Sequence, residues 1–174
     1  MIRKPWVTRC LLVAALAATA AGGARAAAAR SGEIAATSIG PRLGFGLGPD
    51  QVVLGGQVTL GAFHPDWTFS PILEIGFGDH QTVVTLDFDA YYHLYLSDSD
   101  WRPYVGGGLS LDNFNFDREP PFPHESETNA GLNFVVGTSI PTGSSPPMFV
   151  ELRLGVGDIP NLRAMFGLNF PLRK

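Results

Sequence analysis

Two aspartates and a histidine lie close together in the segment TVVTLDFDAYYHLYL, residues 82–96. Asp87 and Asp89 are two residues apart, and His93 follows four residues later. Carboxylates and an imidazole at this spacing could hold a metal ion or exchange protons with a substrate. The same spacing also suits a strand whose alternate side chains share one face. The choice between these interpretations depends on the elements that carry the three residues.

The first 26 residues have the pattern of a secretory signal peptide. Arg3, Lys4 and Arg9 precede an apolar run, Leu11 to Ala21, which is short for a membrane span. An A-x-A cleavage pattern follows at residues 24–26. We therefore expect residues 1–26 to direct export and to be cleaved off. The alternative is an N-terminal membrane anchor.

Cleavage would change the chemistry that the rest of the chain can offer. Cys10, the single cysteine, would leave with the signal peptide, which excludes a disulfide, a thiolate metal site and a cysteine nucleophile. Removal of Arg3, Lys4, Arg9 and Arg25 from the 12 basic residues would give the mature chain a formal charge of about −8 against its 16 acidic residues. Such a chain is a poor partner for nucleic acid.

The remainder of the chain has the pattern of β-strands. Residues 27–36 form a linker of small residues, and from residue 38 onward apolar and polar residues alternate with period two. Turn-forming Gly, Pro, Asp and Ser separate the runs, and no helix is required. The expected strands are 38–48, 51–63, 67–78, 81–96, 102–116, 127–140, 147–157 and 161–170.

Hairpin turns test whether the faces of neighbouring runs agree, because paired residues lie on the same face of a sheet. A two-residue turn at Pro49-Asp50 would pair Gly48 with Gln51. A two-residue turn at Asp79-His80 would pair Ile72 with Asp87. Both turns keep like faces together, which supports the strand assignment.

Two folds fit an alternating pattern of this kind. A soluble barrel of lipocalin type has apolar residues inside, whereas a transmembrane barrel has a polar lumen and an apolar outside. The polar face carries Gly, Ser, Thr, Asn and Gln with few charges, and the apolar face carries none. Lys or Arg on a lipid-facing surface would cost about 2–4 kcal/mol at the midplane. This favours the transmembrane barrel, although Phe63, Ile72 and Val135 on the polar face suit the soluble one. Pro71 is expected to cause a bulge.

Several segments resemble strands of the small OmpA-like outer-membrane β-barrel family. The first is WRPYVGGGLSLDNF, residues 101–114, with its Pro-Tyr-x-Gly-x-Gly pattern. NAGLNFVVG and FVELRLG resemble later strands, and MFGLNF, residues 165–170, resembles the aromatic-ended final strand read by the barrel assembly machinery. The resemblance covers residues 38–170. It implies a monomeric barrel in contact with outer-membrane lipid and lipopolysaccharide. Family members usually end at the final Phe, whereas residues 171–174 follow here.

The charged residues of the polar face form one candidate site inside the barrel. An eight-stranded barrel is just wide enough to be filled by side chains, so acid–base pairs are expected to plug the lumen. The alternative is a cation site or the gate of a narrow pore. Arg42, Arg153 and Arg163 are the expected partners of the acids, with the last two on adjacent strands. The predicted lumen network is Arg42, Glu74, Asp87, Asp89, His93, Glu151, Arg153 and Arg163.

An enzymatic alternative rests on HESETNAG, residues 124–131. It loosely resembles the H-x-S-N-A-G-like motif of outer-membrane lipid A deacylases, which implies Ser126 as nucleophile and His124 as base. Two extra residues separate Ser126 from Asn129, and the motif lies two strands earlier than in that family. The surrounding separator, residues 117–127, is expected to be a solvated extracellular loop, or else a contact for a partner or divalent cations.

The sequence therefore predicts an all-β protein of the bacterial outer membrane. We expect a signal peptide (1–26), a linker (27–36), an eight-stranded antiparallel up-and-down transmembrane β-barrel (37–170) and a C-terminal tail (171–174). The expected role is structural, envelope-interacting or that of a narrow pore, with no catalysis, cofactor or metal. The alternatives are a lipid A-modifying hydrolase and a soluble lipocalin-like binding barrel.

Overall fold

The computed structural model describes residues 35–61, 64, 66–116, 125–143 and 145–172. The expected signal peptide, most of the linker, Phe63 and residues 117–124 lie outside these ranges. Among the described residues, no helix is long and apolar enough to cross a membrane. The strands are β1 (Ala36–Leu47), β2 (Gln51–Gly61), β3 (Trp67–Gly78), β4 (Gln81–His93), β5 (Arg102–Phe116), β6 (Glu125–Thr142), β7 (Ser145–Gly157), β8 (Leu162–Leu168) and β9 (Phe170–Pro171).

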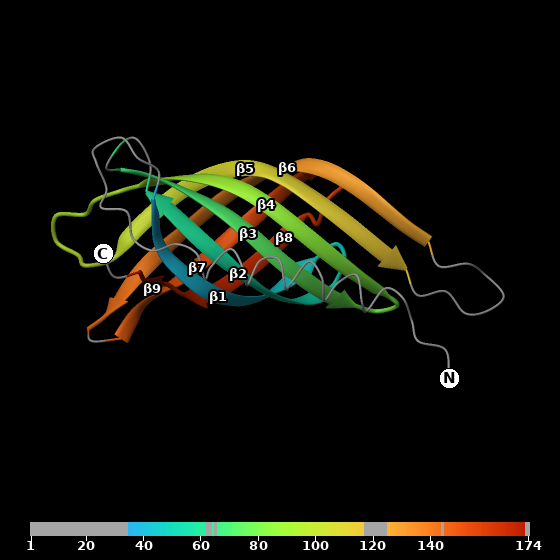
Figure 1. Cartoon of the computed structure of the whole chain (residues 1–174), viewed down its shortest axis with the longest axis horizontal. Coiled ribbons are helices and arrows are strands. Elements are labelled where there is room, and N and C mark those ends of the chain that lie inside the picture. The colour runs from blue at the N-terminus through green and yellow to red at the C-terminus, as the bar shows by residue number, and fades with distance from the viewer. Residues whose placement is uncertain (1–34, 62–63, 65, 117–124, 144, 173–174) are drawn as a thin grey trace.

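These strands form a closed barrel of antiparallel neighbours (Figure 1). Strand β1 pairs with β2 on one side and with β8 on the other, which closes the sheet on itself. Strand β9 continues the line of β8 along β1, so the two together occupy the eighth position. The prediction of an eight-stranded antiparallel up-and-down barrel is confirmed.

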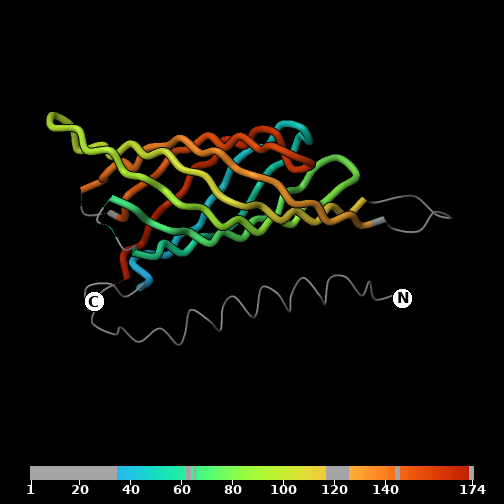
Figure 2. Tube along the Cα trace, turned by 90° about the horizontal axis from the view of Figure 1, so that it is seen from above, coloured from blue at the N-terminus to red at the C-terminus, as the bar shows by residue number. Residues whose placement is uncertain are grey.

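The two ends of the barrel differ in shape (Figure 2). The hairpin end carries the connections β1–β2, β3–β4, β5–β6 and β7–β8, and the terminal end carries the first and last described residues, Ala35 and Leu172. The β5–β6 hairpin extends furthest at the hairpin end. The rim of the barrel there is therefore uneven.

Burial alternates along each strand, with the polar face inside. Arg153 is 0% exposed, whereas its outward neighbours Leu152 and Leu154 are 48% and 53% exposed. In β4, Asp87 and Asp89 are buried and Phe88 between them is exposed. The face assignment from period two is confirmed. It is the reverse of a water-soluble barrel, where large apolar side chains fill the interior. Ile72 and Val135 are buried in the lumen beside polar groups.

The two turn predictions had different outcomes. The Asp79-His80 turn pairs Gly78 with Gln81 and Ile72 with Asp87, as expected. The Pro49-Asp50 prediction was wrong by two residues, because Gln51 pairs with Gly46 and not with Gly48. Gly48 has φ +64°, and its carbonyl accepts from the Asn161 backbone at 3.2 Å. It therefore turns toward the β7–β8 connection, and a shift of two leaves every side chain on its expected face.

Pro71 opens the β2–β3 ladder without the expected bulge. The register pairs Gln57 with Ile72 and Leu60 with Phe69, and the positions between them are not paired across this ladder. The sum of paired residue numbers is the same on both sides of the gap, so the register does not shift. Proline has no N–H to donate to a neighbouring strand, which accounts for the missing pairs.

The last predicted strand is interrupted. Asn169 separates β8 from β9, and its N–H donates to the Pro147 carbonyl at 2.9 Å. Its side-chain oxygen accepts from Gln57 Nε2 at 2.8 Å, across the strand line of β1. The end of the chain is thus tied to the lumen side of β2 as well as to its neighbouring strands.

Candidate functional site

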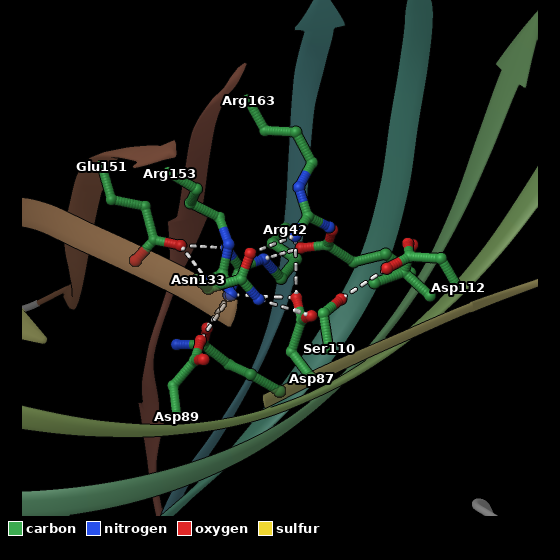
Figure 3. Close-up of polar contacts among 12 residues, drawn as sticks. Arg42, Asp87, Asp89, Ser110, Asp112, Asn133, Glu151, Arg153 and Arg163 are labelled. Atoms are coloured by element: carbon green, nitrogen blue, oxygen red, sulfur yellow. Dashed lines mark hydrogen bonds and ion pairs between the residues drawn. The ribbon is translucent and has the colours of Figure 1, made fainter. Parts of the chain in front are cut away.

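The interior of the barrel holds one continuous polar cluster (Figure 3). Its charged members come from β1, β3, β4, β5, β7 and β8, and each is at most 2% exposed. Strands bring these side chains together because inward positions recur every second residue on neighbouring strands. The charged members are Arg42, Glu74, Asp87, Asp89, Asp112, Glu151, Arg153 and Arg163.

Arg153 is the central cation of this cluster. Its Nη2 lies 2.9 Å from Asp87 Oδ2 and also contacts Asp89 Oδ2, and its Nη1 lies 2.9 Å from Glu151 Oε1. Tyr91 donates its hydroxyl to Asp89 Oδ2 at 3.0 Å. Asp87 and Asp89 are therefore bridged by one guanidinium group.

Arg163 pairs with the acids from the other side. Its Nη1 lies 2.6 Å from Glu74 Oε2 and its Nη2 lies 3.2 Å from Asp87 Oδ2. Asn133 accepts from Arg163 Nη2 at 3.2 Å and donates to Asp87 Oδ1 at 2.8 Å. Asn133 thereby donates to Asp87 Oδ1, while Asp87 Oδ2 pairs with both Arg153 and Arg163.

Arg42 links the network across the closing strands. It contacts Glu151 Oε1, and its Nε lies 2.7 Å from Glu74 Oε1. Its Nη1 donates to Gln57 Oε1 at 2.7 Å, and its guanidinium carbon lies 5.5 Å from the centre of the Phe149 ring. Arg42 therefore meets acids from β3 and β7, which are not neighbours of β1 in the sheet.

Asp112 belongs to the cluster but has a different environment. It is 0% exposed and accepts from Ser110 Oγ at 2.6 Å and from the Thr85 hydroxyl. No salt bridge of the described residues involves it. Five carboxylates, those of Glu74, Asp87, Asp89, Asp112 and Glu151, thus share the lumen with three guanidinium groups.

His93 lies apart from the charges with which the sequence analysis grouped it. Its Nε2 is 2.9 Å from Thr68 Oγ1, and its ring packs against Tyr104 at 5.7 Å. Four residues separate it from Asp89, which is roughly 13 Å along a strand. The ring faces the same side as the aspartates but lies at the terminal end of the cluster.

Sequence reasoning missed the neutral members of the cluster. Gln57, Tyr91, Tyr104 and Asn133 all lie on the inward face, and Tyr104 donates to Glu151 Oε2 at 3.0 Å. The signal was present, because each stands at an inward period-two position. The predicted network was restricted to charged residues and so omitted these neutral ones; it also omitted Asp112, which lies in the cluster.

Glycines on neighbouring strands make room for the large lumen side chains. A Cβ built on Gly137 would lie 2.7 Å from Tyr104 Oη and 2.8 Å from Glu151 Cβ. A Cβ on Gly55 would lie 2.7 Å from Glu74 Cγ. Small residues opposite large ones are how the interior of a narrow barrel is filled.

The described charged members of the cluster form ion pairs and hydrogen bonds with one another. The described residues contain no group of three or more His, Cys, Asp or Glu that could hold a metal ion. Ser126, the nucleophile of the enzymatic alternative, is exposed at the start of β6, and His124 lies outside the described residues. A separate pocket of about 570 Å³ lies at the terminal end between the β4–β5 loop and the β6–β7 hairpin, lined in part by Tyr95, Trp101 and Pro147.

Comparisons with known proteins identify similar folds. No family model matches the sequence, and no curated protein matches it. The N-terminal β-barrel domain of Pseudomonas aeruginosa OprF aligns with 80% of this chain and 100% of its own, at 16% identity and a TM-score of 0.63. Neisserial surface protein A (NspA) aligns with 78% of this chain and 96% of its own, at 15% identity and a TM-score of 0.56. The chain therefore has the fold of these β-barrels.

Proposed function

We propose that this protein is an outer-membrane β-barrel whose lumen is sealed by paired charges, with a structural or envelope-interaction role and no catalysis. The observation that carries the proposal is the reversed burial of the strands. Arg153, Arg163 and Asp87 are at most 1% exposed, while Phe45, Leu109 and other apolar side chains face outward. Outward apolar surface on this scale supports a lipid environment around the barrel.

The outward surface has the boundaries of a membrane-facing band. Near the terminal end, the Trp67 and Tyr92 rings lie 5.4 Å apart, where aromatic side chains prefer the membrane interface. Toward the hairpin end, the outward face of β5 becomes polar, and Asn113 donates to Thr128 Oγ1 at 2.8 Å. The outward positions of the described strands between these limits carry no charged residue.

The filled lumen supports a plug more than a conducting pore. The side chains of Arg153, Asp87 and Asp89 have no exposed area, and they bond to one another across the barrel. Eight strands leave an interior just wide enough for side chains. A narrow pore would require these ion pairs to separate, which leaves buried charges without partners.

The remaining parts of the proposal concern biogenesis and surroundings. Export would use the N-terminal signal peptide, and insertion would use the barrel assembly machinery. The apolar band would contact phospholipid and lipopolysaccharide, and the barrel would be a monomer. The outward-facing Phe170 pairs with Ile39 and supports a role as the terminal aromatic residue, while Pro171 and Leu172 continue along β1.

Membrane fractionation tests the proposal. The full chain is expressed in a Gram-negative host, membranes are separated by density, and migration on gels is compared before and after boiling. The proposal expects recovery in the outer-membrane fraction and a heat-dependent change in migration. Recovery only in the soluble fraction, with migration unaffected by heat, would contradict it and favour the lipocalin-like alternative.

A further inference from the structure

Strand β6 extends beyond one of its neighbours at the hairpin end. Its pairing with β5 reaches the pair Phe116–Glu125, but its pairing with β7 ends at Gly131–Gly157. Among the described residues, none pairs with residues 126–129 on the β7 side. Figure 1 shows the β5–β6 hairpin projecting past the other strands at this end. Residues 126–129 therefore form a free edge of roughly 13 Å.

The direction of the backbone groups on this edge follows from the register. The Gly155 N–H donates to the Asn161 carbonyl at 2.9 Å. The backbone N–H and C=O groups of odd residues in β7 therefore point toward β8, and those of even residues point toward β6. Val156 lies opposite Leu132. In an antiparallel ladder, two directly opposed residues either both direct their N–H and C=O groups toward each other or both direct them away. The backbone groups of even residues in β6 thus point toward the β7 side. Ser126 and Thr128 direct their N–H and C=O groups to the free edge.

The β6–β7 hairpin, which overhangs at the terminal end, is protected against strand addition. At the terminal end, the pairing of β6 with β5 ends at Ser139 and the pairing of β7 with β8 ends at Met148. The overhang beyond these points carries Pro141, Pro146 and Pro147. Proline on an edge blocks pairing with another chain. The sequence of the free edge at residues 126–129, SETN, contains no proline.

The surroundings of the free edge are polar and acidic. The outward-facing Asn113 donates to Thr128, and Asn115 donates to Asn113 at 2.7 Å, so this part of the hairpin lies beyond the apolar band. Glu127 is exposed on the edge strand. Asp158 is exposed on the neighbouring turn, directly after Gly157. Both charged side chains would attract a cationic segment.

We propose that residues 126–129 of β6 form a docking edge that takes up an antiparallel strand from a cationic extended polypeptide. Backbone hydrogen bonds to Ser126 and Thr128 supply the attachment, as in other cases of strand addition. Basic side chains at alternate positions of the added strand meet Glu127 and Asp158. A second copy of this chain is disfavoured, because its own edge would bring Glu127 near a second acidic edge.

Peptide binding to the full chain in detergent micelles tests this docking edge. The probe is a capped heptapeptide of alternating lysine and threonine, and its matched control replaces lysine with glutamate. The lysine probe is expected to bind and to slow hydrogen exchange of the Ser126 and Thr128 amides. N-methylation of alternate peptide nitrogens, which removes the donors of the added strand, is expected to abolish this protection.

Two variants at one position separate edge pairing from side-chain effects. Thr128→Pro and Thr128→Ala both remove the hydroxyl that accepts from Asn113, but only Thr128→Pro removes the N–H on the free edge. We expect Thr128→Pro to weaken binding about tenfold and Thr128→Ala to stay within about twofold of the parent.

Three outcomes would overturn the docking edge. The first is equal binding of the lysine probe to both variants, and the second is equal binding of the lysine and glutamate peptides. The third is a concentration-dependent dimer that Thr128→Pro abolishes while the probe has no effect, which assigns the edge to a second copy of this chain. Should Thr128→Pro fail to fold, equal binding of the N-methylated and unmethylated peptides by the parent protein would overturn the proposal.

Discussion

Arg153 and Arg163 lie directly opposite each other on β7 and β8, and their guanidinium groups share the carboxylate of Asp87. Two like charges in a cross-strand pair repel each other. Here the repulsion is offset because Asp87 lies between them, because Asp89 and Glu151 also pair with Arg153, and because Glu74 pairs with Arg163. The pair is therefore stable only within the complete network, which makes its members sensitive to single substitutions.

Replacement of Arg153 by Leu should destabilise the barrel strongly. The change leaves Asp87, Asp89 and Glu151 without their shared cation in a buried site, and breaking a buried ion pair in this way costs about 3–5 kcal/mol. Urea unfolding followed by gel migration in lipid vesicles measures the effect. The matched control, Asp50→Asn on an exposed turn, should change stability by less than about 0.5 kcal/mol. Equal stability of the two variants would show that the network contributes little.

The adjacent glycines 55 and 56 should respond differently to alanine. A Cβ at Gly55 points into the lumen and meets Glu74 Cγ at 2.7 Å, whereas a Cβ at Gly56 faces outward with its nearest contact at 3.7 Å. Overpacking typically costs about 1–3 kcal/mol, so Gly55→Ala should lower the unfolding free energy by that amount. Gly56→Ala should be close to neutral. The reverse order would mean that the inward and outward faces of β2 are exchanged.

A lysine on the outward face distinguishes lipid from water around the barrel. Leu109 is 60% exposed near the middle of β5, so Leu109→Lys should cost about 2–4 kcal/mol in a bilayer. Asn115→Lys on the same face, near the polar edge of the band, should cost about 0–1 kcal/mol. Folding yields into lipid vesicles give both values. A soluble barrel would tolerate both lysines equally.

Planar bilayer recordings test whether the lumen is closed. The parent protein should give no discrete conductance steps, because Arg153, Asp87 and Asp89 bond across the barrel with no exposed area. A larger porin reconstituted in the same way serves as the positive control. Reproducible steps from the parent protein would contradict the plug and favour the narrow-pore alternative.

The fold was predictable because its signal is local. Alternation within each run defines which side chains face inward, and Asp87, Phe88 and Asp89 follow it. Turn composition was sufficient for the Asp79-His80 hairpin. It failed at Pro49-Asp50 because Gly48 bonds to Asn161, a residue more than a hundred positions away. Contacts of that range leave no pattern in a short window of sequence.

Which charged residues face the lumen was largely predictable, but which of them contact one another was not. Period two places Arg42, Glu74 and Glu151 on the inward face, yet it does not give the stagger of eight strands around the barrel. That stagger decides which inward residues share a level. It brings Asn133 to Asp87 and keeps His93 at the terminal end, beside Thr68.

The contacts of Arg42 make closure of the sheet and packing of its interior a single event. In an open sheet of the same strands, β1 and β7 would lie near opposite edges, and Arg42 could not reach Glu151. The lumen carboxylates would then lack their ion pairs with Arg42 until β1 pairs with β8. A barrel whose sheet is not yet closed therefore has lumen charges without their ion-pair partners. This makes pairing of β1 with β8 strongly cooperative with formation of the polar interior, and it disfavours any long-lived open form.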